Sequence, residues 1–556
     1  MNTRLRVLIA ALRAFVLVFG TAALWLSRDA MNADGVAYLD ASDVYLSGGW
    51  PALGSGYWSP LYPTLLAIAR FVGGTAPGRE LAITQSVNFA LFVLAFVALE
   101  WLVREVRHEA TRRRGVPPND ASWLVLVYVL FAVATNGWIR LWLVTPDMCV
   151  AAIVFAVGAV CVRLESGRVG WTTVVVLGVL LGLGYLAKAA FFPLGIVVVA
   201  TLALVRRRRG GIRQAIVVAG VFLAIAAPQM AYVSRLKGSP TFSDVGRLSY
   251  LWFIANVPGP VTSAFALPAR LPSPDGENQT VVALDPTRGD HPAVYDIDAP
   301  IPGTLPIWYD AGYWYRGVSV PVRPGSLIRA LVRHARVYFE IFALLLVGGV
   351  AAALAGPRSR RDVLTMRPAP LLVVPALAAL TMYAFVLVQD RYVSPFALLL
   401  FAGLVPPWAT DALSRRVRLG FAAGAAATLI GVAHQVRVDA AYWRDTARTR
   451  TRVVAALAQR GIRPGSRLGF IGEAYDALWA RQARVRFVSL VPLAEAARFW
   501  ELDTRARAGV LAHMQQHGAT AIIAESPAPG VNVDGWEQLP PAGNPRSALI
   551  VYGGLR

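Results

Sequence analysis

Charged residues are scarce in this chain. They make up only 16% of its 556 residues, whereas 56% are hydrophobic and the mean hydropathy is +0.51. That composition excludes an ordinary soluble enzyme, and apolar runs long enough to cross a bilayer recur along the sequence. We therefore expect a polytopic α-helical membrane protein.

Acidic residues and cysteines are also few. The 33 acidic residues face 54 lysines and arginines, which gives a net charge of +21. The arginines occur in short bursts between apolar segments, where topology signals belong, so we predict no nucleic-acid partner. Cys149 and Cys161 lie in one expected span, about 18 Å apart along a helix, which is too far for a disulfide between them.

The apolar runs predict about eleven spans. They cover residues 7–26, 81–103, 121–136, 147–163, 170–187, 190–205, 213–233, 336–355, 369–389, 393–408 and 417–435. Since no small-residue cleavage site follows the first run, we expect an uncleaved first span. The brief apolar segment 60–75 is expected to lie on the membrane surface. A transmembrane domain would then cover residues 1–435.

The distribution of arginine predicts the orientation of these spans. With a cytoplasmic N-terminus, the arginine-rich loops, including Arg206 to Arg209, fall on the cytoplasmic side, as the positive-inside rule requires. We expect a multi-pass protein of the inner (plasma) membrane. The extracytoplasmic side then receives the loops 28–75 and 234–330, everything after about 436, and the ionisable span-end residues Arg140, Asp147, Lys188, Asp390 and Arg391. Ionisable residues at span ends are candidates for function, although any one of them could simply reach to the interface.

The first extracytoplasmic loop, within residues 28–75, holds the best candidate for a catalytic base. Asp34, Tyr38, Ala41 and Tyr45 fall at i, i+4, i+7 and i+11, so they share one face if Asn32 or Asp34 begins a short helix. This arrangement places the Asp34 carboxylate at the N-terminal end of that face. The alternative is that Asp34 only caps the helix.

The loop 234–330 is unusually long and rich in proline, glycine and aromatic residues, including Trp308 and Tyr309. Loops of this length are often functional lids, and aromatic rings argue against disorder. Such rings can stack on sugars, so Trp308 and Tyr309 are candidates for substrate binding. They could instead belong to an interfacial aromatic belt.

From about residue 436 the composition becomes that of a soluble protein. Strands are expected at 467–471, 485–490, 519–524 and 548–552, and helices at 474–482 and 493–517, which together predict a small α/β domain at 436–556. It has no phosphate-binding glycine fingerprint. His513 and His517 lie at i and i+4 on a helix, but a third metal ligand is not evident. We expect a structural or acceptor-docking role.

Several motifs in this order resemble the GT-C superfamily of integral-membrane glycosyltransferases, in particular the group of protein O-mannosyltransferases and lipid A aminoarabinose transferases. They span residues 1 to about 410, and each is weak alone. The motifs are Asp34-Gly35-x-x-Tyr38, Trp58-Ser59-Pro60-Leu61-Tyr62-Pro63, Thr145-Pro146-Asp147, Gly182-Leu183-Gly184-Tyr185-Leu186-Ala187-Lys188 and Arg391-Tyr392-x-x-Pro395.

The resemblance implies a GT-C-like fold and sugar transfer from a polyprenyl-phosphate donor on the extracytoplasmic face. It also implies that Asp34 is the general base. Many relatives carry a second acidic residue where this chain has Gly35, which directs attention to Asp40, Asp43 and Asp147 as an alternative second carboxylate. No cofactor is implied, and a divalent metal is left open. The acceptor is left open among protein, lipid and glycan.

The chemistry of such a transfer assigns the remaining residues. A carboxylate must take the proton of the acceptor hydroxyl, and cations must stabilise the departing lipid phosphate, so Lys188 and Arg391 are predicted to bind that phosphate. Attack opposite the leaving group would invert the anomeric centre. The further candidates for substrate binding are Tyr38, Arg140, Asp147 and Tyr392. Simpler alternatives are a snorkelling Lys188, an ion pair at Arg391 and a helix-capping Asp147.

A competing interpretation is a flippase or transporter of a lipid-linked saccharide. Transporters usually place ionisable residues near the bilayer midplane between repeated halves, whereas here they lie at one face and no repeat is evident. A membrane-anchored binding protein would not explain about eleven spans.

Overall fold

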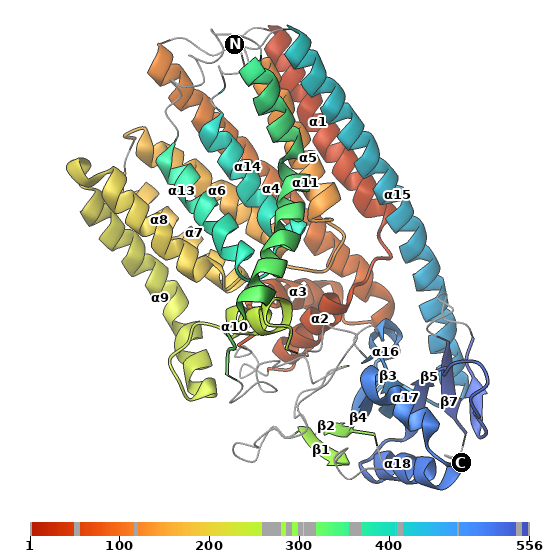
Figure 1. The fold of residues 1–556 in the computed structure, drawn as a ribbon. Coiled ribbons are helices and arrows are strands. Elements are labelled where there is room, and N and C mark those ends of the chain that lie inside the picture. The colour runs from red at the N-terminus through yellow and green to blue at the C-terminus, as the bar shows by residue number, and fades with distance from the viewer. Residues whose placement is uncertain are drawn as a thin grey trace.

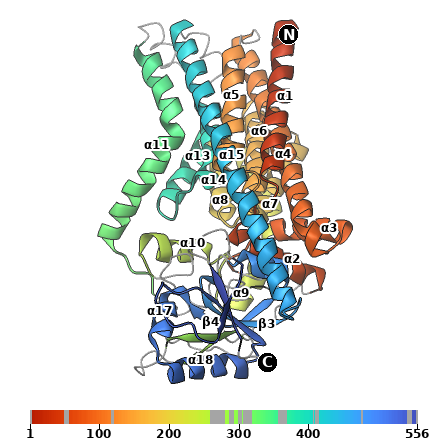
Figure 2. The ribbon, with the colours of Figure 1, turned by 90° about the vertical axis from the view of Figure 1, so that its right-hand side faces the viewer.

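A helical bundle and a smaller sheet domain at one end of it make up the molecule (Figure 1). The computed structural model describes residues 3–48, 56–115, 120–168, 170–257, 280–284, 292–297, 304, 319–354, 369–405, 407, 415–474, 477–540 and 548–553. The N-terminus lies at the end of the bundle that is far from the sheet, and the C-terminal segment lies in the sheet domain (Figures 1 and 2).

Apolar helices build the bundle, and each expected apolar run overlaps one of them. They are α1 (Thr3–Leu26), α4 (Pro77–Arg114), α5 (Ala121–Val133) with its π-helical extension η2 (Ala134–Trp138), α6 (Asp147–Glu165), α7 (Trp171–Ala187), α8 (Phe191–Val205), α9 (Gly211–Lys237), α11 (Pro324–Leu354), α13 (Pro370–Ala384), α14 (Asp390–Leu404) and α15 (Arg415–Gln459). The runs 369–389 and 393–408 extend beyond the ends of α13 and α14. The short 3-10 turn η3 (Arg207–Arg209) joins α8 to α9.

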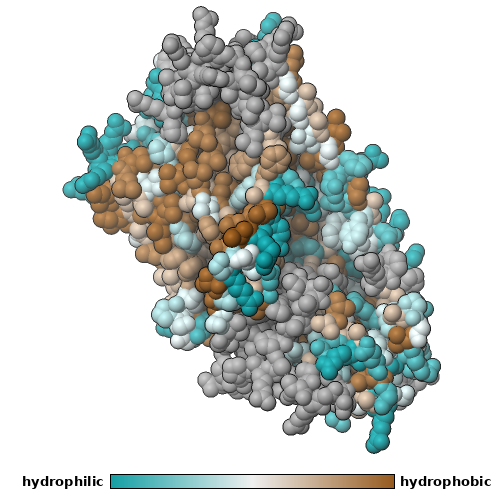
Figure 3. Space-filling model, in the orientation of Figure 1, coloured by the Kyte–Doolittle hydropathy of each residue, from teal (hydrophilic) through white to brown (hydrophobic). Residues whose placement is uncertain are grey.

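The chain is a multi-pass membrane protein. Within the described residues, six helices are long and apolar enough to cross a membrane, and four further apolar helices are shorter. The expected number of about eleven spans stays a prediction. Helix α6 is apolar all round and is almost wholly buried, which places it at the centre of the bundle. Hydrophobic side chains also gather on the outer surface of the bundle (Figure 3), as contact with lipid requires.

Short helices form a layer between the bundle and the sheet. They are α2 (Ala33–Leu46), α3 (Leu61–Gly73), α10 (Val245–Ser249) and the π-helix η4 (Tyr250–Ile254). Helix α3 covers the segment expected on the membrane surface, and its Ile68, Phe71 and Val72 side chains are exposed. An exposed apolar stripe is what a helix at a lipid interface presents.

Helix α15 connects the two parts. Its 45 residues extend about 68 Å at 1.5 Å per residue, roughly twice the thickness of a bilayer's hydrocarbon core. It runs along the bundle and ends beside the sheet (Figures 1 and 2).

The sheet takes strands from two distant parts of the chain. Its order is β1-β2-β4-β3-β5-β7-β6, with β1 (Thr280–Leu284) and β2 (Val294–Ile297) from the long loop and β3 (Arg467–Gly472), β4 (Arg486–Pro492), β5 (Ala521–Glu525), β6 (Trp536–Gln538) and β7 (Leu549–Tyr552) from the C-terminal segment. Strands β4, β3 and β5 are parallel, and the other pairs are antiparallel. The long loop thus completes a sheet that the sequence predicts only after residue 436.

A buried carboxylate fastens β2 to the C-terminal segment. Asp296 accepts a hydrogen bond of 2.8 Å from the Ser489 hydroxyl of β4, and its other oxygen lies 2.7 Å from Nε2 of His513. The His517 ring also lies near, with Nδ1 at 3.7 Å from Asp296. The two histidines singled out for possible metal binding therefore surround a carboxylate that joins two strands.

The predicted helix over 493–517 is wrong at one point. The structure has two helices, α17 (Leu493–Glu501) and α18 (Thr504–Gln516), with a break at Leu502 and Asp503. The side chain of Asp503 accepts a 2.7 Å hydrogen bond from the backbone N–H of Ala506, which begins the second helix. The other expected elements of this domain occur near their predicted positions, with α16 (Leu478–Ala483) as the first helix.

Candidate functional site

A cavity of about 320 Å³ lies where the bundle meets the layer of short helices. It is lined by residues of α2, by the loops before α6 and after α7, by α10 and η4, and by the ends of α13 and α14 that lie toward the sheet. These residues include Asp34, Tyr38, Tyr57, Trp58, Asp147, Lys188, Phe253, Tyr383, Arg391 and Tyr392. Asp147, Lys188 and Arg391 are residues that the sequence places at the ends of spans on one side, and Asp34 belongs to the first loop expected on that side.

Local packing at the start of α2 fixes the position of Asp34. Asn32 precedes the helix and accepts a 2.9 Å hydrogen bond from the backbone N–H of Val144. A Cβ atom on Gly35 would lie 2.7 Å from Cβ of Val144, so only glycine fits this close approach. The second acidic residue that the resemblance leads one to look for therefore has no room at position 35.

Four charged side chains meet in the cavity, and their charges balance. Lys188 Nζ lies 2.7 Å from an oxygen of Asp147, and Arg391 Nη2 lies 3.0 Å from an oxygen of Asp34. Nε of Arg391 is also 3.6 Å from Asp147. The Asp147 side chain is only 2% exposed, whereas that of Asp34 is 24% exposed, so Asp34 is the carboxylate that an incoming group reaches more easily.

The ionic contacts bear on the simpler alternatives for these residues. Lys188 turns into the cavity, over the ring of Tyr392 at 3.3 Å from its centroid, rather than outward. Arg391 forms ion pairs with Asp34 and Asp147, in agreement with its simpler alternative, an ion pair with Asp390 or another carboxylate. The Asp390 carboxylate instead accepts a hydrogen bond from the Arg391 backbone.

Aromatic rings form one wall of the cavity. Tyr38 packs edge-on against Trp58 and Tyr62, with ring centroids 4.8 Å and 5.2 Å away. Burial raises the pKa of the Tyr38 phenol well above its usual range, and the neighbouring Asp34 carboxylate raises it further. Tyr38 is thus a hydrogen-bond donor at any physiological pH, on the same face of α2 as Asp34.

The other sequence candidates lie elsewhere. Arg140 follows η2 with a left-handed backbone (φ 56°) and is not among the cavity-lining residues. Asp40 and Asp43 contact arginines on another side of α2, so Asp147 is the second carboxylate in the cavity. Trp308 and Tyr309 lie outside the described residues.

Tyr57 and Phe253 are among the cavity residues that were not predicted from the sequence. Tyr57 packs on both Trp58 and Trp252. It immediately precedes the recognised Trp58 motif, and that position was a signal that could have identified it from the sequence. Phe253 lies in the π-helical turn η4 of the long loop, and π-helical turns often occur at functional sites. Nothing in the sequence predicts that turn.

Among the described residues, the two cavity carboxylates have no third ligand beside them that would complete a metal site. In the parts of the chain that the structure describes, no group of three or more His, Cys, Asp or Glu residues is placed to hold a metal ion. Asp34 and Asp147 each pair with a cationic side chain instead.

Asp147→Asn is expected to destabilise the protein by about 3 kcal/mol, because it leaves the Lys188 ammonium without its ion-pair partner in a buried site. Thermal unfolding of the detergent-solubilised protein measures this change. The double variant Asp147→Asn, Lys188→Met removes both charges and should recover most of the loss. Equal unfolding temperatures for Asp147→Asn and wild type would show that the pair contributes nothing.

The fold that surrounds this cavity is GT-C-like, the fold of a class of integral-membrane glycosyltransferases, as the sequence resemblance predicts. In fold, the chain is similar to ArnT from Cupriavidus metallidurans, whose structure was solved bound to undecaprenyl phosphate. The TM-score is 0.52 at 13% sequence identity, and the match covers 99% of this chain and 98% of ArnT.

The Archaeoglobus fulgidus oligosaccharyltransferase is a more distant match. Its complex with zinc and sulfate gives a TM-score of 0.46 at 14% identity, covering 92% of this chain and 68% of that one. The archaeal oligosaccharyltransferase AglB from Archaeoglobus fulgidus, in complex with an inhibitory peptide and a dolichol-phosphate, gives a TM-score of 0.43 at 13% identity, covering 92% of this chain and 69% of that one. No protein-family model and no curated protein matches the sequence.

Proposed function

We propose that this protein transfers a sugar from a polyprenyl-phosphate donor to an acceptor hydroxyl on the extracytoplasmic face of the inner (plasma) membrane. The observation that carries the proposal is the neutral cluster of Asp34, Asp147, Lys188 and Arg391 in a cavity at the sheet end of the bundle. The distribution of the arginine-rich loops supports a cytoplasmic N-terminus and an extracytoplasmic position for this end of the bundle.

In the proposed reaction, Asp34 takes the proton of the acceptor hydroxyl while the oxygen of that hydroxyl bonds to the anomeric carbon. The bond from that carbon to the phosphate oxygen breaks, and its electron pair leaves with the lipid phosphate. Lys188 and Arg391 stabilise the charge that develops there. Attack from the opposite face inverts the anomeric centre.

The ion pair between Arg391 and Asp34 suggests that the donor phosphate also controls whether the Asp34 carboxylate is available as a base. Arg391 can form charge-assisted hydrogen bonds either with the Asp34 carboxylate or with a phosphate. A bound donor phosphate would draw the guanidinium away from Asp34 and leave that carboxylate available for the acceptor proton. The base would then be released only when a donor is present.

The aromatic wall supports a sugar-sized substrate. Tyr38, Trp58 and Tyr57 present ring faces and edges beside Asp34, where the sugar must lie if its anomeric carbon faces the base. We propose Tyr38 as a substrate-binding residue on this basis, and Tyr392 because it lines the same cavity beside Lys188 and Arg391. The acceptor class, whether protein, lipid or glycan, is not assigned.

Reconstituted vesicles test the proposal with a panel of radiolabelled polyprenyl-phosphate sugars and a membrane extract as the source of acceptor. The expected result is label in a new glycoside, formed with release of the polyprenyl phosphate. Label that crosses the bilayer while still attached to its lipid, with no new glycoside for any donor, would refute transfer and favour a flippase.

A further inference from the structure

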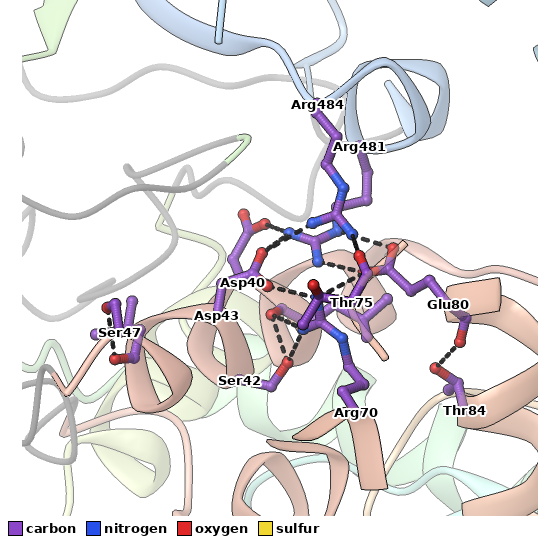
Figure 4. A network of polar contacts seen from close by, with 12 residues as sticks. Asp40, Ser42, Asp43, Ser47, Arg70, Thr75, Glu80, Thr84, Arg481 and Arg484 are labelled. Carbon is purple, nitrogen blue, oxygen red and sulfur yellow. Dashed lines mark hydrogen bonds and ion pairs between the residues drawn. The ribbon is translucent and has the colours of Figure 1, made fainter. Parts of the chain in front are cut away.

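A second charged cluster lies outside the cavity, between α2 and the C-terminal domain (Figure 4). It contains three carboxylates and three guanidinium groups, which belong to Asp40, Asp43, Glu80, Arg70, Arg481 and Arg484. We call these six residues the docking cluster. The proposed transfer reaction uses none of them.

Arg481 of α16 makes most of the contacts across this junction. Its guanidinium forms a bidentate interaction with the Glu80 carboxylate, with Nε at 3.1 Å and Nη2 at 2.6 Å. The third nitrogen, Nη1, lies 2.7 Å from Asp40 and also contacts Asp43. The Arg481 side chain is only 4% exposed. A buried bidentate contact of this kind fixes the relative orientation of the two side chains in addition to pairing their charges.

Arg484 adds a second contact from the end of the same helix. It lies 2.8 Å from Glu80 and 3.2 Å from Asp43, and its backbone is left-handed with φ 55°. That conformation is uncommon for a residue other than glycine. Here it ends α16 and directs the side chain toward α2 and α4.

The charge balance shows that the cluster depends on the C-terminal domain. The bundle side contributes Asp40, Asp43 and Glu80 but only one cation, Arg70, whose side chain is 1% exposed. Such an excess of buried negative charge is unfavourable. Arg481 and Arg484 supply the two missing positive charges, so the sheet domain and α2 are electrostatically complementary.

The docking cluster and the cavity lie on opposite sides of one helix. Asp43 is nine residues after Asp34, which at 3.6 residues per turn places it about 180° around α2. Asp40 also receives hydrogen bonds from the backbone and hydroxyl of Thr304 in the long loop, the N–H at 2.8 Å and the hydroxyl at 3.2 Å. Rotation or displacement of α2 would therefore move the docking cluster and Asp34 together.

We propose that Arg481 is a positioning residue: through the docking cluster it holds α2 in the rotation and depth that keep Asp34 against the donor site. The C-terminal domain is then a part of the transfer site rather than only an appendage or an acceptor-binding module. This inference rests on the proposed function, since it assigns the cluster to the placement of the proposed base.

The test compares Arg481→Gln with Arg460→Gln. Arg460 lies in the same domain and forms a partly exposed ion pair with Glu537 of β6 rather than with a residue of α2, so it is the matched control. Asp34 lies on α2, whereas the proposed phosphate-binding residues Lys188 and Arg391 do not. Arg481→Gln should therefore lower kcat by about tenfold to hundredfold, as expected for a displaced catalytic group, while its affinity for the unglycosylated polyprenyl phosphate stays within about twofold of the wild-type value. Arg481→Lys keeps the positive charge but loses the bidentate contact, so its kcat should lie between those of wild type and Arg481→Gln.

Asp43→Asn removes a charge of the docking cluster on the α2 side with little change of side-chain shape. It provides an independent test if Arg481→Gln fails to fold. Hydrogen exchange of residues 33–46 should rise in Asp43→Asn and Arg481→Gln and stay unchanged in Arg460→Gln. An unchanged kcat in folded Arg481→Gln and Asp43→Asn would overturn the inference while leaving the proposed function intact. If wild type transfers no sugar, the proposed function fails, and unchanged exchange in α2 would separately refute the docking role.

The docking cluster should also persist at mildly acidic pH. Burial alone would raise the pKa of Asp43, but the guanidinium groups around it outweigh this and lower the pKa below its usual range. The charged groups that surround Asp43 are Arg70, Arg481, Arg484, Glu80 and Asp40. A lowered folded-state pKa means that the stabilisation is present above about pH 4 and is lost only as the pH falls through the lower, folded value.

Hydrogen exchange of residues 33–46, corrected for the intrinsic effect of pH, measures this. We expect equal protection between pH 8 and about 5. A loss of protection in α2 between pH 7 and 5 would contradict the lowered pKa of Asp43.

Discussion

Asp34→Asn is expected to lower the rate of sugar transfer by about 10²–10⁴-fold, the usual contribution of a general base. The amide keeps the size of the side chain and can still contact Arg391, but it cannot take the acceptor proton. The binding of polyprenyl phosphate should persist, because Lys188 and Arg391 are unchanged. Initial rates of transfer together with equilibrium binding of the unglycosylated lipid phosphate measure the two effects separately.

The matched control is Asp445→Asn, which removes one carboxylate from the exposed surface of α15. It should transfer sugar at the wild-type rate. If Asp34→Asn retains more than about a tenth of the wild-type rate while Asp445→Asn is unaffected, a different group accepts the proton. Asp147 would be the next candidate, since it is the other carboxylate in the cavity.

Arg391→Gln is expected to weaken the binding of polyprenyl phosphate by about tenfold to hundredfold, which corresponds to the loss of a charge-assisted hydrogen bond worth about 1.5–3 kcal/mol. The substitution also leaves Lys188 alone against Asp34 and Asp147, so the cavity becomes net negative and repels the phosphate. Titration with a short-chain polyprenyl phosphate in detergent measures the affinity, and it does not require the sugar to be known.

Arg336→Gln serves as the control, since Arg336 is 83% exposed on α11 and pairs only with its helix neighbour Glu340 among the described residues. A similar loss of affinity in both variants would indicate a general effect of charge on binding to a lipid anion. Unchanged affinity in Arg391→Gln would mean that Arg391 serves only to hold Asp34 and Asp147.

The sequence predicts the helices of the bundle well because a lipid-facing helix must be apolar over its whole length, and such runs are visible without any knowledge of packing. It also brings out Asp34, Asp147, Lys188 and Arg391, because ionisable residues at the ends of apolar runs are rare and the arginine-rich loops assign them to one side. The structure places these four side chains in one cavity.

The docking cluster could not be predicted in the same way. Asp43 and Arg481 are separated by 438 residues, and each alone looks like an ordinary surface charge. The sequence did contain one signal of the cluster, because Arg70 interrupts the otherwise apolar segment of α3. In the structure this side chain is wholly buried. Strands β1 and β2 escaped notice for a related reason, because a short strand that joins a distant sheet has no periodicity long enough to detect.

The shared sheet has a consequence for how the molecule is made. Asp296 in β2 and Ser489 in β4 are 193 residues apart, and α11, α13, α14 and α15 are synthesised between them. Until β4 arrives, the β1–β2 pair has an open edge, and open edges invite pairing with other chains. A chain truncated after α14 would keep both this open edge and the unbalanced carboxylates around α2, two defects that quality-control proteases could recognise. We therefore expect the segment from α15 to the last strand to protect the long loop and α2 from degradation, because it pairs the open strand edge and neutralises the carboxylates.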